Sequence, residues 1–171
     1  MASPRRCYIG LGANLGDPAD RVVQAMGWLD ALPGTAGVAR SSLYRSPPQG
    51  PQDQPDFCNA VCALDTALEP MALLDHLQAL EQRAGRTRGE HWGPRTLDLD
   101  IISYDQRVVH HARLTLPHPW AHRRAFVLVP WLEIAPDACL PGLGAAREHL
   151  SAADRATVRP WSAASPSAGC A

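Results

Sequence analysis

The amino-acid sequence predicts an α+β fold: a ferredoxin-like βαββαβ sandwich with extra C-terminal elements, its helices on one face of the sheet and the active site on the other. The prediction rests on the order of the segments. Four of them have the apolar or alternating pattern of strands, and two have an apolar stripe at helical spacing. A chain of 171 residues has room for one domain with a core, which we place at residues 1–159; residues 160–171 are expected to form a disordered tail.

A strand and a helix are expected first. Residues 7–11 have the pattern of a strand, and Asp17 then caps a helix over residues 18–32. Apolar residues recur at helical spacing in that helix: Val22, Ala25, Met26 and Leu29. The G-x-G at residues 10–12 lacks a third glycine and a G-K-[ST] sequence, so it indicates a plain turn more than a phosphate loop.

Two strands, a helix and a last strand follow. The two strands are expected at residues 38–45 and 57–64, and the helix over residues 70–84. Leucines form the buried stripe of that helix: Leu73, Leu74, Leu77 and Leu80. The last strand lies in residues 95–102, and the chain is then expected to turn through a hairpin at residues 105–106.

Asp98 and Asp100 make the last strand the most informative segment. Side chains alternate across a strand, so its leucines and isoleucine face the core, while the two carboxylates share the other face with their stems roughly 6.6–7 Å apart. Carboxylates at this spacing can hold one or two Mg²⁺ ions against a polyphosphate, and a cation offsets their mutual repulsion. The alternative is a solvated face of an edge strand. The three arginines, the glycines and the Trp of residues 86–95 favour the metal site.

The third strand offers a surface for a flat ring. Phe57 and Asn59 are two residues apart, so they lie on the same face. An aromatic ring beside an amide that both donates and accepts hydrogen bonds suits a flat heterocycle. On its own, a Phe is more often part of a core.

Composition excludes several classes of protein. The net charge of −1 disfavours a nonspecific nucleic-acid binder, and the absence of lysine makes every cationic side chain an arginine, suited to forked phosphate contacts. Five cysteines without a C-x-x-C pair suggest core thiols in a reducing cytosol. No apolar run reaches membrane length, and no signal peptide is recognisable. We therefore expect a cytoplasmic protein without a membrane or nucleic-acid partner.

Together these motifs resemble the 6-hydroxymethyl-7,8-dihydropterin pyrophosphokinase family, whose members move the β,γ-diphosphate of ATP onto a pterin hydroxymethyl group in folate biosynthesis. The matching segments run in order along the chain from about residue 7 to 137. They are residues 8–16, 44–48, 50–55, 57–60, 91–100, 117–118 and 124–126, and Pro130.

The resemblance implies a set of site residues. ATP is the expected co-substrate and a reduced pterin the acceptor; two Mg²⁺ ions are expected on Asp98 and Asp100, and a monomer is expected. Residues implied in catalysis are Arg86, Arg88, Arg95, Asp98 and Asp100. Residues implied around the pterin are Ser46, Pro47, Gln49, Phe57, Asn59, Trp92 and Phe126. Residues implied around ATP are Gln78 and Glu81 at the edge of the second helix, Arg88, Trp92, Arg95, Ile101, Arg113, Thr115, His118 and Arg124.

Two other classes share parts of this pattern. An RNA-binding module can have the same sheet, but it needs aromatic stretches and a basic face on the central strands, where this chain has Asp98 and Asp100. A D-x-D nucleotidyl- or glycosyltransferase would share the metal chemistry. Such an enzyme has no use for a ring clamp formed by Phe57, Asn59 and Phe126.

The arginine-containing segment generates a first prediction. Residues 86–92 have no aliphatic anchor, so we expect this loop to be mobile without ligand and to close over the phosphates. Contacts made chiefly on the way to the transition state raise kcat rather than ground-state affinity. Arg88→Ala is therefore expected to cut kcat severely and to leave the Kd for the pterin nearly unchanged, as measured by steady-state kinetics and titration calorimetry. A rise in Kd that matches the fall in kcat would contradict this role.

Overall fold

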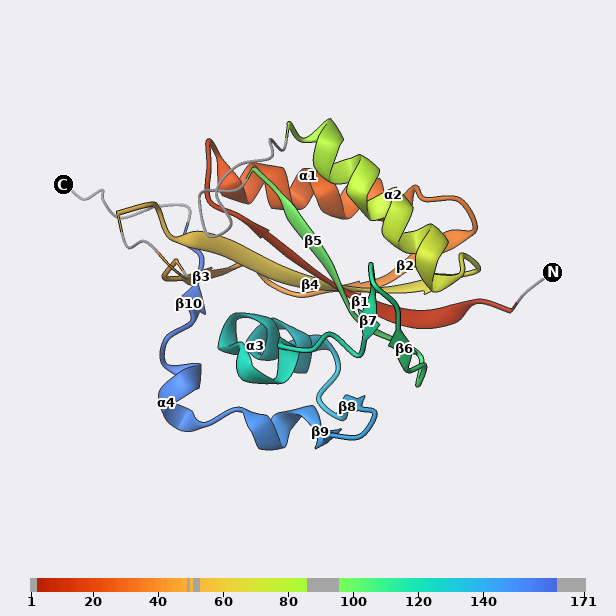
Figure 1. Ribbon diagram of the computed structural model, residues 1–171. Helices are drawn as coiled ribbons and strands as arrows, with labels where there is room; N and C mark the ends of the chain where they lie inside the picture. The colour runs from red at the N-terminus through yellow and green to blue at the C-terminus, as the bar shows by residue number, and fades with distance from the viewer. Residues whose placement is uncertain (1–2, 49, 51–52, 86–95, 163–171) are drawn as a thin grey trace.

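The computed structural model describes residues 3–48, 50, 53–85 and 96–162 (Figure 1). One six-stranded sheet forms its centre. Its strands are β1 (Arg5–Ala13), β2 (Thr35–Arg40), β3 (Tyr44–Ser46), β4 (Phe57–Thr66), β5 (Asp98–Tyr104) and β10 (Arg159–Pro160). The order is β10-β3-β4-β1-β5, with β2 also paired to β4, and every pairing is antiparallel.

Helices cover both faces of this sheet. The helices are α1 (Pro18–Asp30), α2 (Pro70–Arg83), α3 (Ala125–Ile134) and the short α4 (Ala152–Arg155), with 3₁₀ turns η1 (Ala121–Arg123) and η2 (Ala146–His149). α1 and α2 lie on one face, whereas α3 and the C-terminal elements lie on the other (Figure 1). Two small antiparallel ribbons complete the fold: β6 (Val109–His110) with β7 (Thr115–Leu116), and β8 (Cys139–Leu140) with β9 (Gly144–Ala145).

The mixed α and β composition and the antiparallel sheet confirm the predicted class, but the expectation of helices on one face only is wrong. The residues of α3 are almost all apolar, so the helix shows no stripe in the sequence. It buries Leu128 and Trp131 in a second core cluster against Val61 of β4 and Ile102 of β5. Because α3 is apolar on all sides, it must be covered on more than one side, and the sheet covers one of these.

The alternation of side chains predicts the two faces of the strands correctly. Cys58 and Cys62 of β4 and Leu99 and Ile101 of β5 are buried in the core under α1 and α2. The predicted stripe of α1 is buried as well. Asp17 caps α1, and its carboxylate accepts the N–H of Asp20.

Three expected boundaries differ from the structure. The strand expected at residues 38–45 is two strands, β2 and β3, because the Ser41 hydroxyl replaces a backbone carbonyl and accepts the N–H of Val61 at 2.9 Å. The chain turns at residues 105–106, but the strand that follows pairs with β7 and not with β5. Residue 160 was expected to begin a disordered tail, but Pro160 pairs with Tyr44 of β3; residues 163–171 lie outside the described residues.

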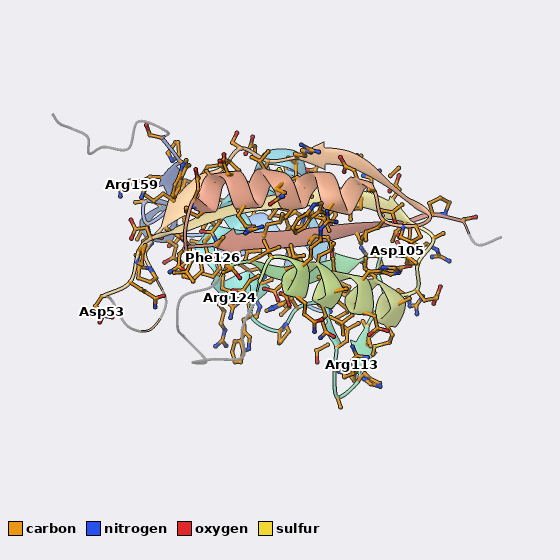
Figure 2. All side chains as sticks on the ribbon, turned by 90° about the horizontal axis from the view of Figure 1, so that it is seen from above. Asp53, Asp105, Arg113, Arg124, Phe126 and Arg159 are labelled. Atoms are coloured by element: carbon orange, nitrogen blue, oxygen red, sulfur yellow. The ribbon has the colours of Figure 1, made fainter. Side chains whose placement is uncertain are left out.

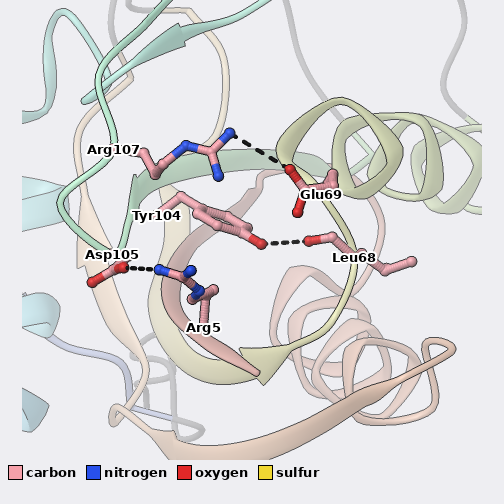
Figure 3. A network of polar contacts seen from close by, with 6 residues as sticks. All are labelled: Arg5, Leu68, Glu69, Tyr104, Asp105 and Arg107. Carbon is pink, nitrogen blue, oxygen red and sulfur yellow. Dashed lines mark hydrogen bonds and ion pairs between the residues drawn. The ribbon is translucent and has the colours of Figure 1, made fainter. Parts of the chain in front are cut away.

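One end of β5 is fixed by polar contacts with its neighbours (Figure 3). The buried Tyr104 donates its hydroxyl to the carbonyl of Leu68 at 2.6 Å, and burial raises the pKa of this phenol. Asp105 forms an ion pair with Arg5 of β1 at 2.7 Å. The opposite end of β5, which begins with Asp98, is the end that faces the site described below.

No helix in the described ranges is long and apolar enough to cross a membrane.

Glu133 ties α3 to the chain around β3 and generates a stability prediction. Its carboxylate accepts the N–H of Ser42 at 2.9 Å, the Ser42 hydroxyl at 2.8 Å and the Tyr44 hydroxyl at 2.7 Å. Burial opposes the charge, but these three donors outweigh it and lower the pKa of Glu133. Because the pKa of Glu133 is lower in the folded state, its charge stabilises the fold above the unfolded-state pKa of about 4.3. This stabilisation is lost as pH falls through the folded-state pKa.

Glu133→Gln is therefore expected to lower Tm at pH 7 by about 2–4 °C, the shift that about 1 kcal/mol produces in a domain of this size. The difference from the unmodified chain should shrink below about pH 4. Thermal unfolding followed by circular dichroism measures both values, with Glu148→Gln on exposed η2 as the control. A Tm difference that does not depend on pH would show that the charge of Glu133 is irrelevant.

Candidate active site

A cavity of about 780 Å³ opens on the α3 side of the sheet. Strands β1, β4 and β5 form its floor, and the segment leading into α3 forms its wall. Nine of the residues predicted for the site line it together: Ser46, Pro47, Phe57, Asn59, Asp98, Asp100, His118, Arg124 and Phe126. The predicted residues Gln49, Arg86, Arg88, Trp92 and Arg95 lie outside the described residues.

Two glycines of β1 form the middle of the floor. Gly12 pairs with Asn59 of β4 on one side and with Asp98 of β5 on the other, and Gly10 pairs likewise with Asp100. A Cβ at Gly12 would lie 3.2 Å from Asn59 Nδ2 and 3.7 Å from Phe57 Cδ1. The glycines therefore keep the floor open between the amide and the carboxylates.

The interpretation of this G-x-G as a plain turn is wrong, because Gly10 and Gly12 lie within strand β1. Their spacing of two residues is the signal that was missed. On a strand this spacing places both glycines on one face, which here is the face that Asp98 and Asp100 share.

The amide side of the cavity is rigidly held. Asn59 is buried and its Oδ1 accepts a hydrogen bond from the Ser46 hydroxyl at 2.5 Å. Ser46 lies directly across from Phe57 in the antiparallel pairing of β3 with β4. Because the amide oxygen is fixed by Ser46, the orientation of the Asn59 amide is set before any ligand binds.

The carboxylate side is formed by the start of β5. Asp98 is half-buried and Asp100 is exposed, and both line the cavity. Within the part of the chain that the structure describes, no group of three potential metal ligands occurs. The two carboxylates suit Mg²⁺ nevertheless, because Mg²⁺ is commonly held by one or two carboxylates while phosphates and water complete its shell.

His118 offers a neutral donor beside these carboxylates. Burial lowers the pKa of His118, the charge of Asp100 opposes this shift, and Arg124 adds to it. The Nδ1 atom of His118 accepts the N–H of Trp120 at 3.1 Å, so the proton of the neutral ring sits on Nε2. Arg124, at the start of α3, lies with its guanidinium carbon 5.7 Å from the centre of the Phe126 ring (Figure 2).

The other residues predicted for ATP that the structure describes do not line the cavity. Ile101 is buried under α1 and α2, and its neighbour Ile102 lines the cavity instead; the alternation of side chains requires this. Thr115 is exposed on β7. Arg113 bonds to Gln78 at 2.9 Å and to Asp75 at 2.6 Å on the outside of α2, away from Arg124 (Figure 2).

Glu81 was expected at the edge of the second helix, away from its buried stripe, and this is wrong. The side chain is buried, and its Oε2 accepts the N–H of Leu99 at 2.8 Å. Leu99 lies between Asp98 and Asp100 on β5, the last strand of the sheet, where its N–H has no strand beyond it to bond. Glu81 therefore anchors the strand that carries both carboxylates.

Comparison with known proteins identifies the family. A sequence profile of the 7,8-dihydro-6-hydroxymethylpterin-pyrophosphokinase (HPPK) family matches residues 8–136. The chain belongs to this family. The family predicted from the motifs is thereby confirmed.

Several HPPK relatives are similar over most of their length. The 2-amino-4-hydroxy-6-hydroxymethyldihydropteridine pyrophosphokinase of Haemophilus influenzae is 48% identical over 134 residues, which are 78% of this chain and 84% of that protein. The protein of the same name from Pseudomonas aeruginosa is 49% identical over 137 residues, 80% and 85% of the two chains. That from Mycobacterium bovis is 41% identical over 170 residues, 90% and 88% of the two chains.

Solved structures share the fold. An HPPK-DHPS chain in complex with substrates superimposes with a TM-score of 0.67 at 11% identity, covering 86% of this chain and 43% of that one. The HPPK-DHPS of Plasmodium falciparum with pteroate gives a TM-score of 0.69 at 11% identity, covering 85% and 40%. This chain thus spans less than half of those longer chains.

The contact between Glu81 and Leu99 generates a prediction. Glu81→Ala leaves a buried N–H without its acceptor, so we expect it to lower the free energy of unfolding by about 1–3 kcal/mol and to lower activity by displacing the carboxylate strand. Glu81→Gln keeps an acceptor oxygen and should lower both the free energy of unfolding and the activity by less. Asp75→Ala, which removes a surface ion pair of the same helix, is the control and should cost less than about 1 kcal/mol. Equal losses in Glu81→Ala and Asp75→Ala would rule out the anchoring role.

Proposed function

We propose that this chain transfers the β,γ-diphosphate of ATP to the hydroxymethyl group of 6-hydroxymethyl-7,8-dihydropterin, giving AMP and the pterin diphosphate. Membership of the HPPK family makes the chain a pyrophosphokinase of folate biosynthesis. The observation that carries the proposal is a single cavity with a ring-and-amide surface on β4 and a carboxylate pair on β5, separated only by the glycines of β1.

The pterin is assigned to the amide side. Phe57 and Phe126 line the cavity from β4 and α3, two elements on either side of the space where a flat ring would lie. Asn59 presents its amide there, with the orientation set by Ser46. Stacking on two rings plus an amide edge provides both affinity and recognition of the heterocycle.

The triphosphate is assigned to the carboxylate side. Asp98 and Asp100 would hold two Mg²⁺ ions, which when bound neutralise charge on the phosphates. Arg124 adds a fixed positive charge, and the neutral His118 can donate from Nε2 to a phosphate oxygen without repelling the metal ions. The described residues that line the cavity include no evident general base, and the hydroxymethyl proton leaves late or through Asp98 or Asp100. Alignment of the attacking hydroxyl and electrostatic stabilisation are therefore the main contributions of these residues.

Three further assignments belong to this proposal. The order β2-β4-β1-β5, with α1 and α2 on one face, supports a ferredoxin-like core to which α3 and the C-terminal elements are added. Cys7, Cys58 and Cys62 are free, buried thiols whose pKa is raised to about 12 by burial, which supports a cytoplasmic location. The monomer that the family resemblance implies completes these assignments.

Product analysis tests the function directly. Incubation with ATP, Mg²⁺ and 6-hydroxymethyl-7,8-dihydropterin should give AMP and a diphosphorylated pterin by mass spectrometry. Chelation of Mg²⁺ with EDTA should abolish both products. Formation of ADP with a monophosphorylated pterin, or no pterin product at all, would refute the proposal.

The carboxylate pair generates a prediction about turnover. Asp98→Asn and Asp100→Asn each remove a charged ligand next to phosphate, so kcat should fall by at least ~10²-fold, comparable to the loss of one strong electrostatic contact. Tm should change little, because relief of like-charge repulsion offsets lost contacts. Asp105→Asn, at the other end of β5, is the matched control and should keep its activity. Near-normal turnover of either site variant with Mg²⁺ would contradict the assignment of the metal ions to Asp98 and Asp100.

The two phenylalanines generate a prediction about binding. Phe57→Ala and Phe126→Ala should each weaken pterin binding by roughly 1–3 kcal/mol, the scale of base–aromatic stacking. Affinity for a non-hydrolysable ATP analogue should change much less, because the phosphates are assigned to the other side of the cavity. Titration calorimetry measures both affinities. If both variants unfold, and Phe57→Tyr unfolds as well, these residues are core residues and not a clamp.

A further inference from the structure

The C-terminal strand β10 closes the outer edge of β3, far along the chain from the cavity residues. Pro160 pairs with Tyr44 and Arg159 with Arg45, and the N–H of Trp161 donates to the carbonyl of Leu43 at 2.9 Å. Figure 1 shows β10 beside β3 at one side of the sheet. Without β10, a strand of three residues would be an open edge, paired in the described sheet only to β4 and tied to α3 through Glu133.

A side-chain contact strengthens this pairing. The guanidinium carbon of Arg45 lies 4.0 Å from the centre of the Trp161 ring, a cation–π contact. The same guanidinium lies 3.8 Å from the carboxylate of Asp56, the residue just before Phe57. Arg45 therefore links Trp161 to β3, on which it lies, and to Asp56 at the start of β4.

Trp161 contacts β3, and β3 carries Ser46, the residue that orients the amide of Asn59. Ser46 follows Arg45 on β3, lies opposite Phe57, and donates its hydroxyl to Asn59. No residue from 159 to 161 lines the cavity. Any effect of Trp161 on the pterin is therefore indirect, through Arg45 and β3 or through the core cluster against which Trp161 packs.

We propose that residues 159–161 are a positioning element of the pterin site, in which Trp161 acts through Arg45 to hold Ser46, Phe57 and Asn59 in place before the pterin binds. This inference rests on the proposed function. A site that is already ordered loses less conformational entropy on binding, so the element increases affinity for the pterin without touching it. β10 pairs with β3 and not with β5, and Glu133, which ties α3 to Tyr44 of β3, lies at the other end of α3 from Arg124, so we expect the ATP side to be unaffected.

The test compares Trp161→Ala with a control Trp that packs against the same core cluster but does not contact β3. Trp28 of α1 lies under the Arg83 guanidinium at 4.3 Å, so Trp28→Ala removes a cation–π contact between a half-buried Trp and an exposed Arg, neither of which lines the cavity. Titration calorimetry with 6-hydroxymethylpterin, at saturating Mg²⁺ and non-hydrolysable ATP analogue, gives the pterin Kd of each variant. Differential scanning calorimetry gives each Tm.

Trp161→Ala should raise the Kd and KM for the pterin about 3- to 10-fold, the range expected when a contact of this strength no longer preorders the site. The Kd for the ATP analogue and kcat at saturating pterin should stay within about twofold, a change below that of a single weak contact. Trp161→Phe keeps a ring and should restore most of the affinity. Trp28→Ala should lower Tm as much as Trp161→Ala and leave pterin binding intact.

Hydrogen–deuterium exchange of the ligand-free chain separates this inference from the proposed function. Amides of residues 44–46 and 57–59 should exchange faster in Trp161→Ala than in Trp28→Ala. Unchanged exchange, or equal pterin affinity in the unmodified chain and Trp161→Ala, would overturn the positioning role and leave the proposed function standing. A failure of the unmodified chain to bind pterin would overturn the proposed function, while the exchange rates would still decide whether Trp161 holds β3.

Discussion

The site depends on one constraint, the simultaneous antiparallel pairing of β1 with β4 and with β5. The registers place Asn59, Gly12 and Asp98 side by side across three strands. Because neighbouring strands lie roughly 4.7–4.9 Å apart, the amide and the first carboxylate are separated by two strand spacings, roughly 10 Å. A pterin ring on one side and a triphosphate on the other can therefore meet above the β1 glycines, which have no side chains.

The parts around this floor fix its edges. Glu81 bonds to the backbone between the two carboxylates, and Tyr104 and Asp105 fix the far end of the same strand. On the opposite side, Ser46 fixes Asn59 from β3. Hydrogen bonds between protein groups thus orient the two chemical halves of the cavity separately, so that disturbance of one half need not disturb the other.

Local pattern was enough to predict the faces of the strands and the two amphipathic helices. The period of two residues in β4 and β5 separates Phe57 and Asn59 from the core cysteines, and Asp98 and Asp100 from the core leucines, in the sequence as in the structure. The features that the sequence did not reveal depend on long-range partners. Glu81 follows Leu73 and Leu77 at the spacing of the buried stripe, but its charge argued against burial, and only the N–H at the nearby edge of β5 supplies the partner that burial requires.

Three further features were unpredictable for the same physical reason. The helix α3 is apolar on all sides, so its pattern does not say which side meets the sheet. The break at Ser41 arises because a hydroxyl replaces a backbone acceptor for Val61. The pairing of β10 joins residues more than a hundred positions apart, which no local propensity encodes.

The central claim is that a single cavity holds the pterin on the β4 side and the metal-bound triphosphate on the β5 side of the β1 glycines. A crystal structure of the chain with Mg²⁺, a non-hydrolysable ATP analogue and 6-hydroxymethylpterin tests this claim most directly. The account predicts the pterin ring between Phe57 and Phe126, and metal ions in contact with both Asp98 and Asp100. A pterin bound elsewhere, or metal ions that contact neither aspartate, would contradict it.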